Sequence, residues 1–60
     1  MTASFLDVRE VADLLALPVN TVYDYAKRGI GPPSFKIGRH RRWDRNQVLK
    51  WIEDLKAEAQ

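Results

Sequence analysis

Two breaks divide this chain into short segments, and they limit its fold more than any other feature. The stretch GIGPP at residues 29–33 places two glycines and two prolines in five positions, a composition that neither a helix nor a paired strand accommodates. Pro18 cannot donate a backbone hydrogen bond inside a helix, but it suits the first turn of one. A chain of 60 residues also buries only about 60% of its unfolded surface. We therefore expect residues 1–60 to form one domain of short elements around a small core.

Apolar residues spaced three and four apart predict two helices before the glycine- and proline-rich break. The first covers residues 8–16, and Asp7 and Glu10 have the spacing of a capping box at its start. The second covers residues 18–28 and ends at Gly29, a residue suited to the left-handed position that follows a helix. Only a short turn separates the two helices, so they form a tight helix-turn-helix unit.

A hairpin and a third helix are predicted after the break. SFKI alternates polar and apolar residues, GRH can turn and RRW can return, which predicts a two-stranded hairpin over residues 34–43. The third helix covers residues 45–57, and Asp44 and Gln47 repeat the capping spacing. The fold class is then mostly α: a three-helix winged helix-turn-helix with a two-stranded β-hairpin wing. Four aromatic or apolar side chains are expected to face its core: Phe35, Ile37, Trp43 and Trp51.

The charge of the chain is unevenly distributed. Residues 27–45 contain seven of the ten lysines and arginines but one of the eight acidic residues, a net charge of +6, which leaves −4 on the remainder. A basic surface of this kind suits duplex DNA, whose closely spaced phosphates release counterions when cations neutralise them. The alternative to DNA binding is that these charges form an ordinary solvated turn without a ligand. A protein-interaction module or antitoxin-like partner that meets an acidic protein is a further possibility.

Two sets of residues are candidates for DNA contact. The second helix would enter the major groove, and the hairpin would lie along the backbone or in a minor groove. Asp24 could accept a hydrogen bond from cytosine or pair with Arg28, and we favour the pair. Asn20 has the amide geometry that reads adenine. The candidates are Asn20, Thr21, Tyr23, Asp24, Tyr25, Lys27 and Arg28 on the helix, and Lys36, Arg39, His40, Arg41 and Arg42 on the wing.

The same sequence argues against an enzyme, a metal site or a cofactor site. His40 is the one histidine and there is no cysteine, so a metal-binding or catalytic set lacks its further members. No apolar run approaches the roughly 18 residues that a membrane span requires. We therefore expect a cytoplasmic protein without a membrane association. Leu49 lies beside the apolar stripe of the third helix, where it either widens the core face or adds to a surface for a protein partner.

Two stretches, FLDVREVADLLALPVNTVYDYAKRG and FKIGRHRRWDRNQVLKWI, contain a threonine, an apolar residue and a tyrosine early in helix two, an isoleucine-glycine-arginine turn and a late tryptophan. In these features the chain resembles, from about Phe5 to Leu55, the small excisionase-type, MerR-like winged helix-turn-helix proteins. Relatives often have serine at the place of Pro18 and a basic residue at the place of Asp24. In MerR-like relatives a tyrosine at the place of Tyr25 often contacts the DNA backbone.

The resemblance implies a function as well as a fold. A stand-alone copy of this module is similar to an excisionase, or recombination directionality factor, of a phage or mobile element. Such proteins bind attachment sites side by side, bend the DNA and help an integrase excise the element in a bacterial host cell. The expected partners are therefore double-stranded DNA, an integrase and further copies of the chain. The alternative is a small MerR-like transcriptional regulator.

Overall fold

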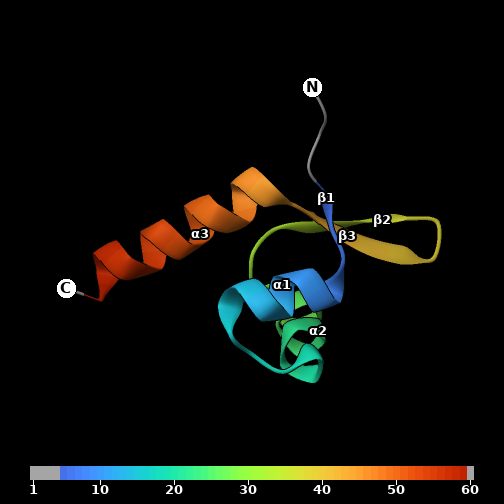
Figure 1. Cartoon of the computed structure of the whole chain (residues 1–60), viewed down its shortest axis with the longest axis horizontal. Coiled ribbons are helices and arrows are strands. Elements are labelled where there is room, and N and C mark those ends of the chain that lie inside the picture. The colour runs from blue at the N-terminus through green and yellow to red at the C-terminus, as the bar shows by residue number, and fades with distance from the viewer. Residues whose placement is uncertain (1–4, 60) are drawn as a thin grey trace.

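The computed structural model describes residues 5–59, which form three helices and a small antiparallel sheet (Figure 1). In chain order the elements are β1 (Phe5–Leu6), α1 (Val8–Leu15), α2 (Val19–Arg28), β2 (Ser34–Ile37), β3 (His40–Asp44) and α3 (Arg45–Glu58). Helix α1 and helix α2 follow one another and pack together, and the hairpin of β2 and β3 comes before helix α3. The mostly helical winged helix-turn-helix predicted from the sequence is confirmed.

The sheet has three strands rather than the two expected, because the N-terminal strand β1 pairs with the far side of β3. The strand order is β1-β3-β2, and β3 is antiparallel to both neighbours. Leu6 lies opposite Trp43 in one pair and Ser34 lies opposite Trp43 in the other. A two-residue strand has little sequence signal of its own, and its pairing with β3 is a contact between distant parts of the chain.

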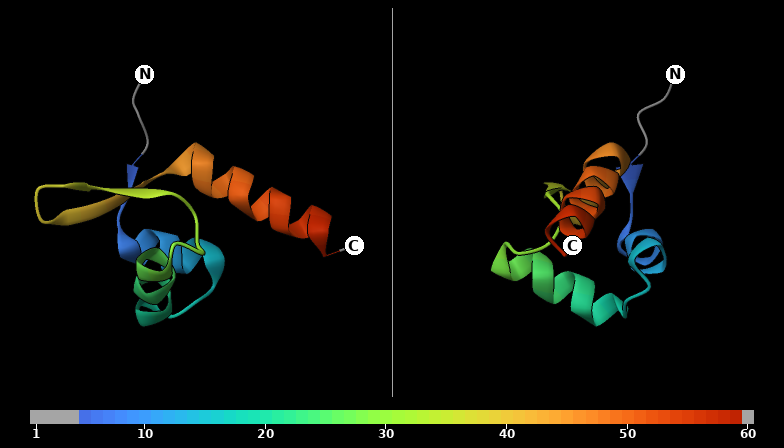
Figure 2. Two further views of the ribbon diagram at one scale, coloured as in Figure 1. Left: turned by 180° about the vertical axis from the view of Figure 1, so that it is seen from behind. Right: turned by 90° about the vertical axis from the view of Figure 1, so that its left-hand side faces the viewer.

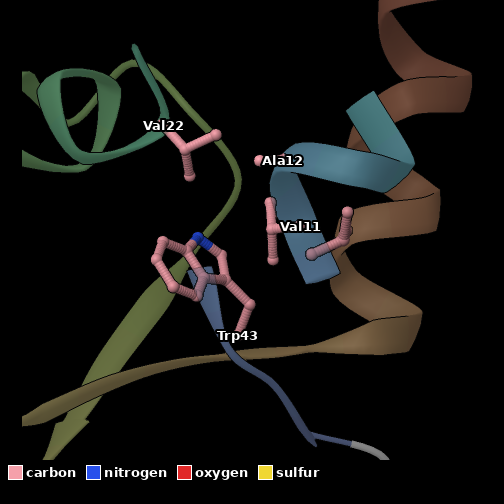
Figure 3. Close-up of a cluster of buried hydrophobic side chains, with 5 residues drawn as sticks. Val11, Ala12, Val22 and Trp43 are labelled. Atoms are coloured by element: carbon pink, nitrogen blue, oxygen red, sulfur yellow. The ribbon is translucent and has the colours of Figure 1, made fainter. Parts of the chain in front are cut away.

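The core centres on Trp43, whose side chain is completely buried. Its indole lies between α1 and α2, with Val11 and Val22 beside it (Figure 3). Val48 adds the contribution of α3. Because β3 holds Trp43 and also forms half of the hairpin, burial of this one side chain attaches the wing to the helices. Trp51, which the sequence suggested would share this core, is only partly buried and lines an open groove.

The expectation that Phe35 and Ile37 face the core is wrong, and the register of the hairpin gives the reason. Side chains alternate between the two sides of a strand, and directly paired residues share a side. Trp43 pairs with Ser34, so Phe35 and Ile37 are on the opposite side of the sheet. They are 38% and 53% exposed. We call the side with Trp43 the inner side and the side with Phe35 the outer side.

The N-terminal ends of the helices follow the predicted capping chemistry in part. Asp7 and Glu10 form the complete capping box, with two backbone-to-carboxylate hydrogen bonds of 2.9 Å. Asp44 caps α3 by accepting from the backbone of Asn46 and Gln47. Pro18 precedes α2 as its N-cap and has no side-chain cap, so α2 begins one residue later than expected.

The C-terminal ends of α1 and α2 share one geometry. The amide of Leu17 donates to the carbonyl of Ala12 and the amide of Ile30 donates to that of Tyr25, the long hydrogen bond of a Schellman motif. The left-handed position within each motif is held by Ala16 in α1 and by Gly29 in α2. Glycine is common at this position and alanine is not, so the sequence indicated the end of α2 and extended α1 by one residue.

The molecule is elongated, with principal extents of 38 × 30 × 18 Å. The hairpin and the C-terminal half of α3 extend toward opposite ends, and α1 and α2 form the body between them (Figures 1 and 2). Within residues 5–59, none of the helices has the length and apolar character needed to cross a membrane.

The alternation of sides in the hairpin can be tested by stability measurements on two apolar residues. Trp43→Ala should lower the free energy of unfolding by about 3–5 kcal/mol, because it removes a large buried side chain. Ile37→Ala should change it by no more than about 0.5 kcal/mol, because that side chain is exposed. Urea denaturation followed by far-UV circular dichroism measures both. Comparable losses would place Ile37 in the core and contradict the register.

Candidate nucleic-acid interface

Helix α2 presents a polar face to solvent. Asn20, Tyr23, Asp24 and Lys27 are spaced at i, i+3, i+4 and i+7, and all four are exposed. Val22 on the opposite face is buried in the core. The helix therefore holds its apolar face against Trp43 and leaves this polar face free to contact a ligand.

Asp24 forms an ion pair with Arg28, as the sequence favoured. The carboxylate oxygen lies 3.2 Å from the Nε atom of Arg28, and both side chains are largely exposed. An exposed pair of this type contributes little stability, about 0–1 kcal/mol. Its main effect is that the carboxylate on this face of α2 lies beside a cation, which reduces the repulsion that Asp24 alone would exert on a phosphate.

The cations of the wing are divided between the two sides of the hairpin. Lys36 and Arg41 are directly paired and share the inner side with Trp43. Arg42 is on the outer side, and its guanidinium donates to the backbone carbonyl of Arg41 at 2.9 Å. Gly38 and Arg39 form the two-residue turn of the hairpin. The φ of +63° at Gly38 is characteristic of the first position of a type II′ turn, and Arg39 follows it.

A hollow of about 290 Å³ lies between α2 and the inner side of the wing. We call it the cationic hollow, and six residues line it: Tyr23, Lys27, Lys36, Arg39, His40 and Arg41. His40 pairs with Ile37 and therefore belongs to the outer side of the hairpin, next to the turn. No carboxylate is among these lining groups. Within residues 5–59 the three ion pairs involve Arg28, Lys50 and Lys56, so the cations of the hollow have no acidic partner. Cations gathered without carboxylates suit an anionic ligand that contacts α2 and the wing together.

Arg41 is held in a fixed position at the edge of this hollow. Its Nη1 atom donates to the hydroxyl oxygen of Ser34 at 2.6 Å. Arg39 and Lys36 are exposed and make no side-chain hydrogen bond among the described residues. The hollow therefore combines one oriented guanidinium with cations that remain free to adjust to a ligand.

Tyr25 lies beside the loop rather than in the cationic hollow. It is half-buried, and a Cβ atom added at Gly31 would approach the Cβ atom of Tyr25 to 2.9 Å. Gly31 is therefore required for the close approach of the loop to α2. Tyr25 and Arg41 together line a depression of about 330 Å³ next to the loop, so the predicted contact of Tyr25 with a DNA backbone would have to occur there.

The sequence-predicted residues thus fall into four groups. Six line the cationic hollow, and Asn20, Asp24 and Arg28 are exposed on α2 outside it. Thr21 and Tyr25 are partly buried, and Arg42 is on the outer side of the sheet. Arg42 was not separated from Arg41 by sequence reasoning, although consecutive residues of a strand lie on opposite sides of the sheet. Among the described residues, no three His, Cys, Asp or Glu side chains come together as a metal site.

The different positions of Arg39 and Arg42 predict different salt dependence of DNA binding. Arg39→Ala should reduce the slope of log affinity against log salt by about 0.9, because each lost phosphate contact removes about that amount. Arg42→Ala removes the same charge from the outer side and serves as the matched control, with a slope close to that of the original protein. Fluorescence anisotropy of a labelled duplex at several salt concentrations measures both slopes. Equal reductions would show that the hollow has no special role.

Comparison with known proteins gives the family of the chain. The sequence profile described as a helix-turn-helix domain matches residues 5–56, which include every helix and strand except the last residues of α3. A comparison with curated proteins gave no match, and neither did one with solved structures. With nearly the whole chain matched, and with a winged arrangement that joins an exposed helix face to a cationic hairpin, the protein belongs to the helix-turn-helix domain family, a DNA-binding family that includes excisionase-like proteins.

Proposed function

We propose that this protein is an excisionase: it binds and bends attachment-site DNA of a phage or mobile element and directs an integrase toward excision. Helix α2 enters the major groove, and the wing enters the adjacent minor groove of the same duplex. The protein contributes no chemical step of its own. Its contribution is to hold the DNA in a shape that the integrase can use.

The observation that carries this proposal is the cationic hollow. Tyr23 and Lys27 from α2 and Lys36, Arg39 and Arg41 from the wing line one concave surface. A duplex that follows this surface meets α2 and the wing on the same side of the protein. Opposite orientations of α2 and the wing would have prevented simultaneous contact with neighbouring grooves.

The residues take distinct roles in this proposal. The cations of the hollow bind the phosphate backbone that separates the two grooves, which gives affinity for any sequence. Asn20 is close to the N-terminus of α2, where recognition helices contact base edges, and its amide can form two hydrogen bonds with adenine. Arg42 is not assigned a contact, because it is on the outer side of the sheet.

Binding in two adjacent grooves supports the bending component of the proposal. A narrow minor groove has an enhanced negative potential that attracts inserted arginine side chains. Arg39 is at the exposed tip of the wing, the position from which a guanidinium would enter such a groove. Bending the duplex around the protein costs a deformation energy that depends on the DNA sequence, and the additional protein surface that the bent duplex touches offsets this cost.

A mobility-shift and bending assay on attachment-site DNA tests the excisionase role. We expect a ladder of cooperative complexes, together with a position-dependent mobility that reports a bend. Addition of the matching integrase should increase the yield of excision and decrease that of integration. A single discrete complex on promoter DNA, with no effect on recombination, would instead identify a transcriptional regulator, which has the same DNA-contacting features. Binding that does not weaken between low and high salt would contradict DNA as the ligand.

Substitution of Asn20 tests the direct reading of a base. Asn20→Ala should reduce discrimination at one base pair by about 1–3 kcal/mol, because it removes a bidentate contact, and should leave the salt slope unchanged. Selection of bound sequences from a random duplex pool, carried out with both proteins, measures the change. Identical selected motifs would remove Asn20 from the proposed contacts.

A further inference from the structure

Ser34 is not one of the residues that the sequence predicts to contact DNA, yet it bonds to one of them. Its hydroxyl oxygen accepts a hydrogen bond of 2.6 Å from the Nη1 atom of Arg41. Among residues 5–59 this is the only hydrogen bond that the Arg41 side chain makes, and none of the three ion pairs there includes Arg41. A neutral hydroxyl therefore orients the guanidinium and leaves its charge uncompensated.

The register of the hairpin shows the direction in which this bond holds the guanidinium. Lys36 is directly opposite Arg41, and Ser34 is on the same side of the sheet but further from the turn. Long side chains can reach such a diagonal neighbour, whereas two cations directly opposite each other repel. The bond to Ser34 therefore directs the guanidinium of Arg41 toward the loop that precedes β2 and away from the turn.

The backbone of Ser34 is itself restricted on both sides. Two prolines, at residues 32 and 33, come directly before it, and the proline ring fixes the backbone angle φ. The same loop approaches α2 closely at Gly31. Across the sheet, Ser34 is paired with the completely buried Trp43. A hydroxyl on a backbone held in this way can fix the position of a long side chain that bonds to it.

Arg41 connects two depressions of the surface. Among the described residues, it alone lines both the cationic hollow and the depression of about 330 Å³ beside the loop. Ser34 and Gly29, the residue after α2, line the second depression, and Arg41 is the only lysine or arginine that does so. The orientation of this one guanidinium therefore extends the cationic surface from the hollow to the C-terminal end of α2.

We propose that Ser34 is a positioning residue for DNA binding, which holds Arg41 so that its guanidinium contacts a backbone phosphate at the loop end of the wing. The inference rests on the proposed function and adds a residue to the same DNA-binding surface. Ser34 acts through Arg41 and makes no DNA contact of its own. A guanidinium held through one N–H group keeps its other N–H groups for a phosphate. A side chain ordered before binding also loses less conformational entropy when the complex forms.

The expected effect follows from the entropy of one side chain. Ordering a long, flexible side chain at an interface has a cost that corresponds to about 2- to 12-fold in affinity. Ser34→Ala removes the hydroxyl but leaves the charge of Arg41, so the affinity for duplex DNA should fall by an amount in this range. Ser34→Thr keeps a hydroxyl and suits a strand, so it should bind within about twofold of the original protein.

A double-mutant cycle tests whether Ser34 acts through Arg41. Ser34→Ala should weaken binding of the original protein, but it should have almost no further effect once Arg41 is alanine, because residues that act as a pair are not additive. Arg39→Ala is the matched control, since it removes a cation of the same wing that is not bonded to Ser34. In that background Ser34→Ala should keep its full effect. Fluorescence anisotropy, on a duplex that the original protein selects from a random pool, measures the affinities, and urea denaturation checks that each variant folds.

Phosphate ethylation interference locates the contact on the DNA. Ethylation removes the charge of one phosphate at a time, so it weakens binding where the protein contacts that phosphate. Ser34→Ala and Arg41→Ala should both become insensitive to ethylation at the same phosphate. Arg39→Ala should become insensitive at a different phosphate, nearer the turn of the wing. A general structural role of Ser34 would instead weaken binding without a loss of sensitivity at one position.

Any of four results would overturn the proposal. Ser34→Ala could bind as tightly as the original protein, or lose the same affinity with and without Arg41. Ser34→Thr could bind no better than Ser34→Ala, or the interference pattern of Ser34→Ala could match that of the original protein. Each of these leaves the proposed function intact as long as the original protein binds duplex DNA. Failure of the folded original protein to bind any duplex would instead contradict the proposed function itself.

Discussion

Burial of Trp43 is the interaction on which the rest of this structure depends. The indole is enclosed by residues of α1, α2 and α3, and it is attached to the central strand of the sheet. A two-stranded ribbon on its own is marginally stable in water. Here the third strand and this single anchor give the wing a fixed orientation relative to α2. The same side chain therefore stabilises a small core and positions the two parts of the DNA-binding surface.

The fold also separates the cations that pair with carboxylates from those that line the cationic hollow. Lys50 and Lys56 on α3 and Arg28 on α2 each lie beside a carboxylate. The cations around the cationic hollow lie close to one another and have no such partner in the described part of the chain, residues 5–59. Gathering like charges costs stability, and proteins commonly tolerate this local cost at functional sites. A polyanion that enters the hollow relieves this repulsion between cations. The repulsion that destabilises the free protein therefore favours formation of the complex.

The small size of the chain explains why apolar surface remains exposed beside a compact centre. Among residues 5–59, five hydrophobic residues form the buried core: Val11, Ala12, Val22, Trp43 and Val48. The C-terminal half of α3 extends beyond this core (Figure 1), and Phe5, Phe35 and Ile37 on the outer side of the sheet are exposed.

The sequence by itself determined the local structure: apolar spacing indicated the three helices, Asp7 and Asp44 marked two starts, Gly29 marked an end, and Gly38 marked the hairpin turn. It also concentrated the cations in one region. These features depend on neighbouring residues, so they can be read along the chain. Only the tertiary structure decided that β1 joins the sheet, that Phe35 and Ile37 face outward, and that Arg42 is separated from the cationic hollow. Pairing register sets which side a strand residue occupies, and a shift of one residue reverses every side chain.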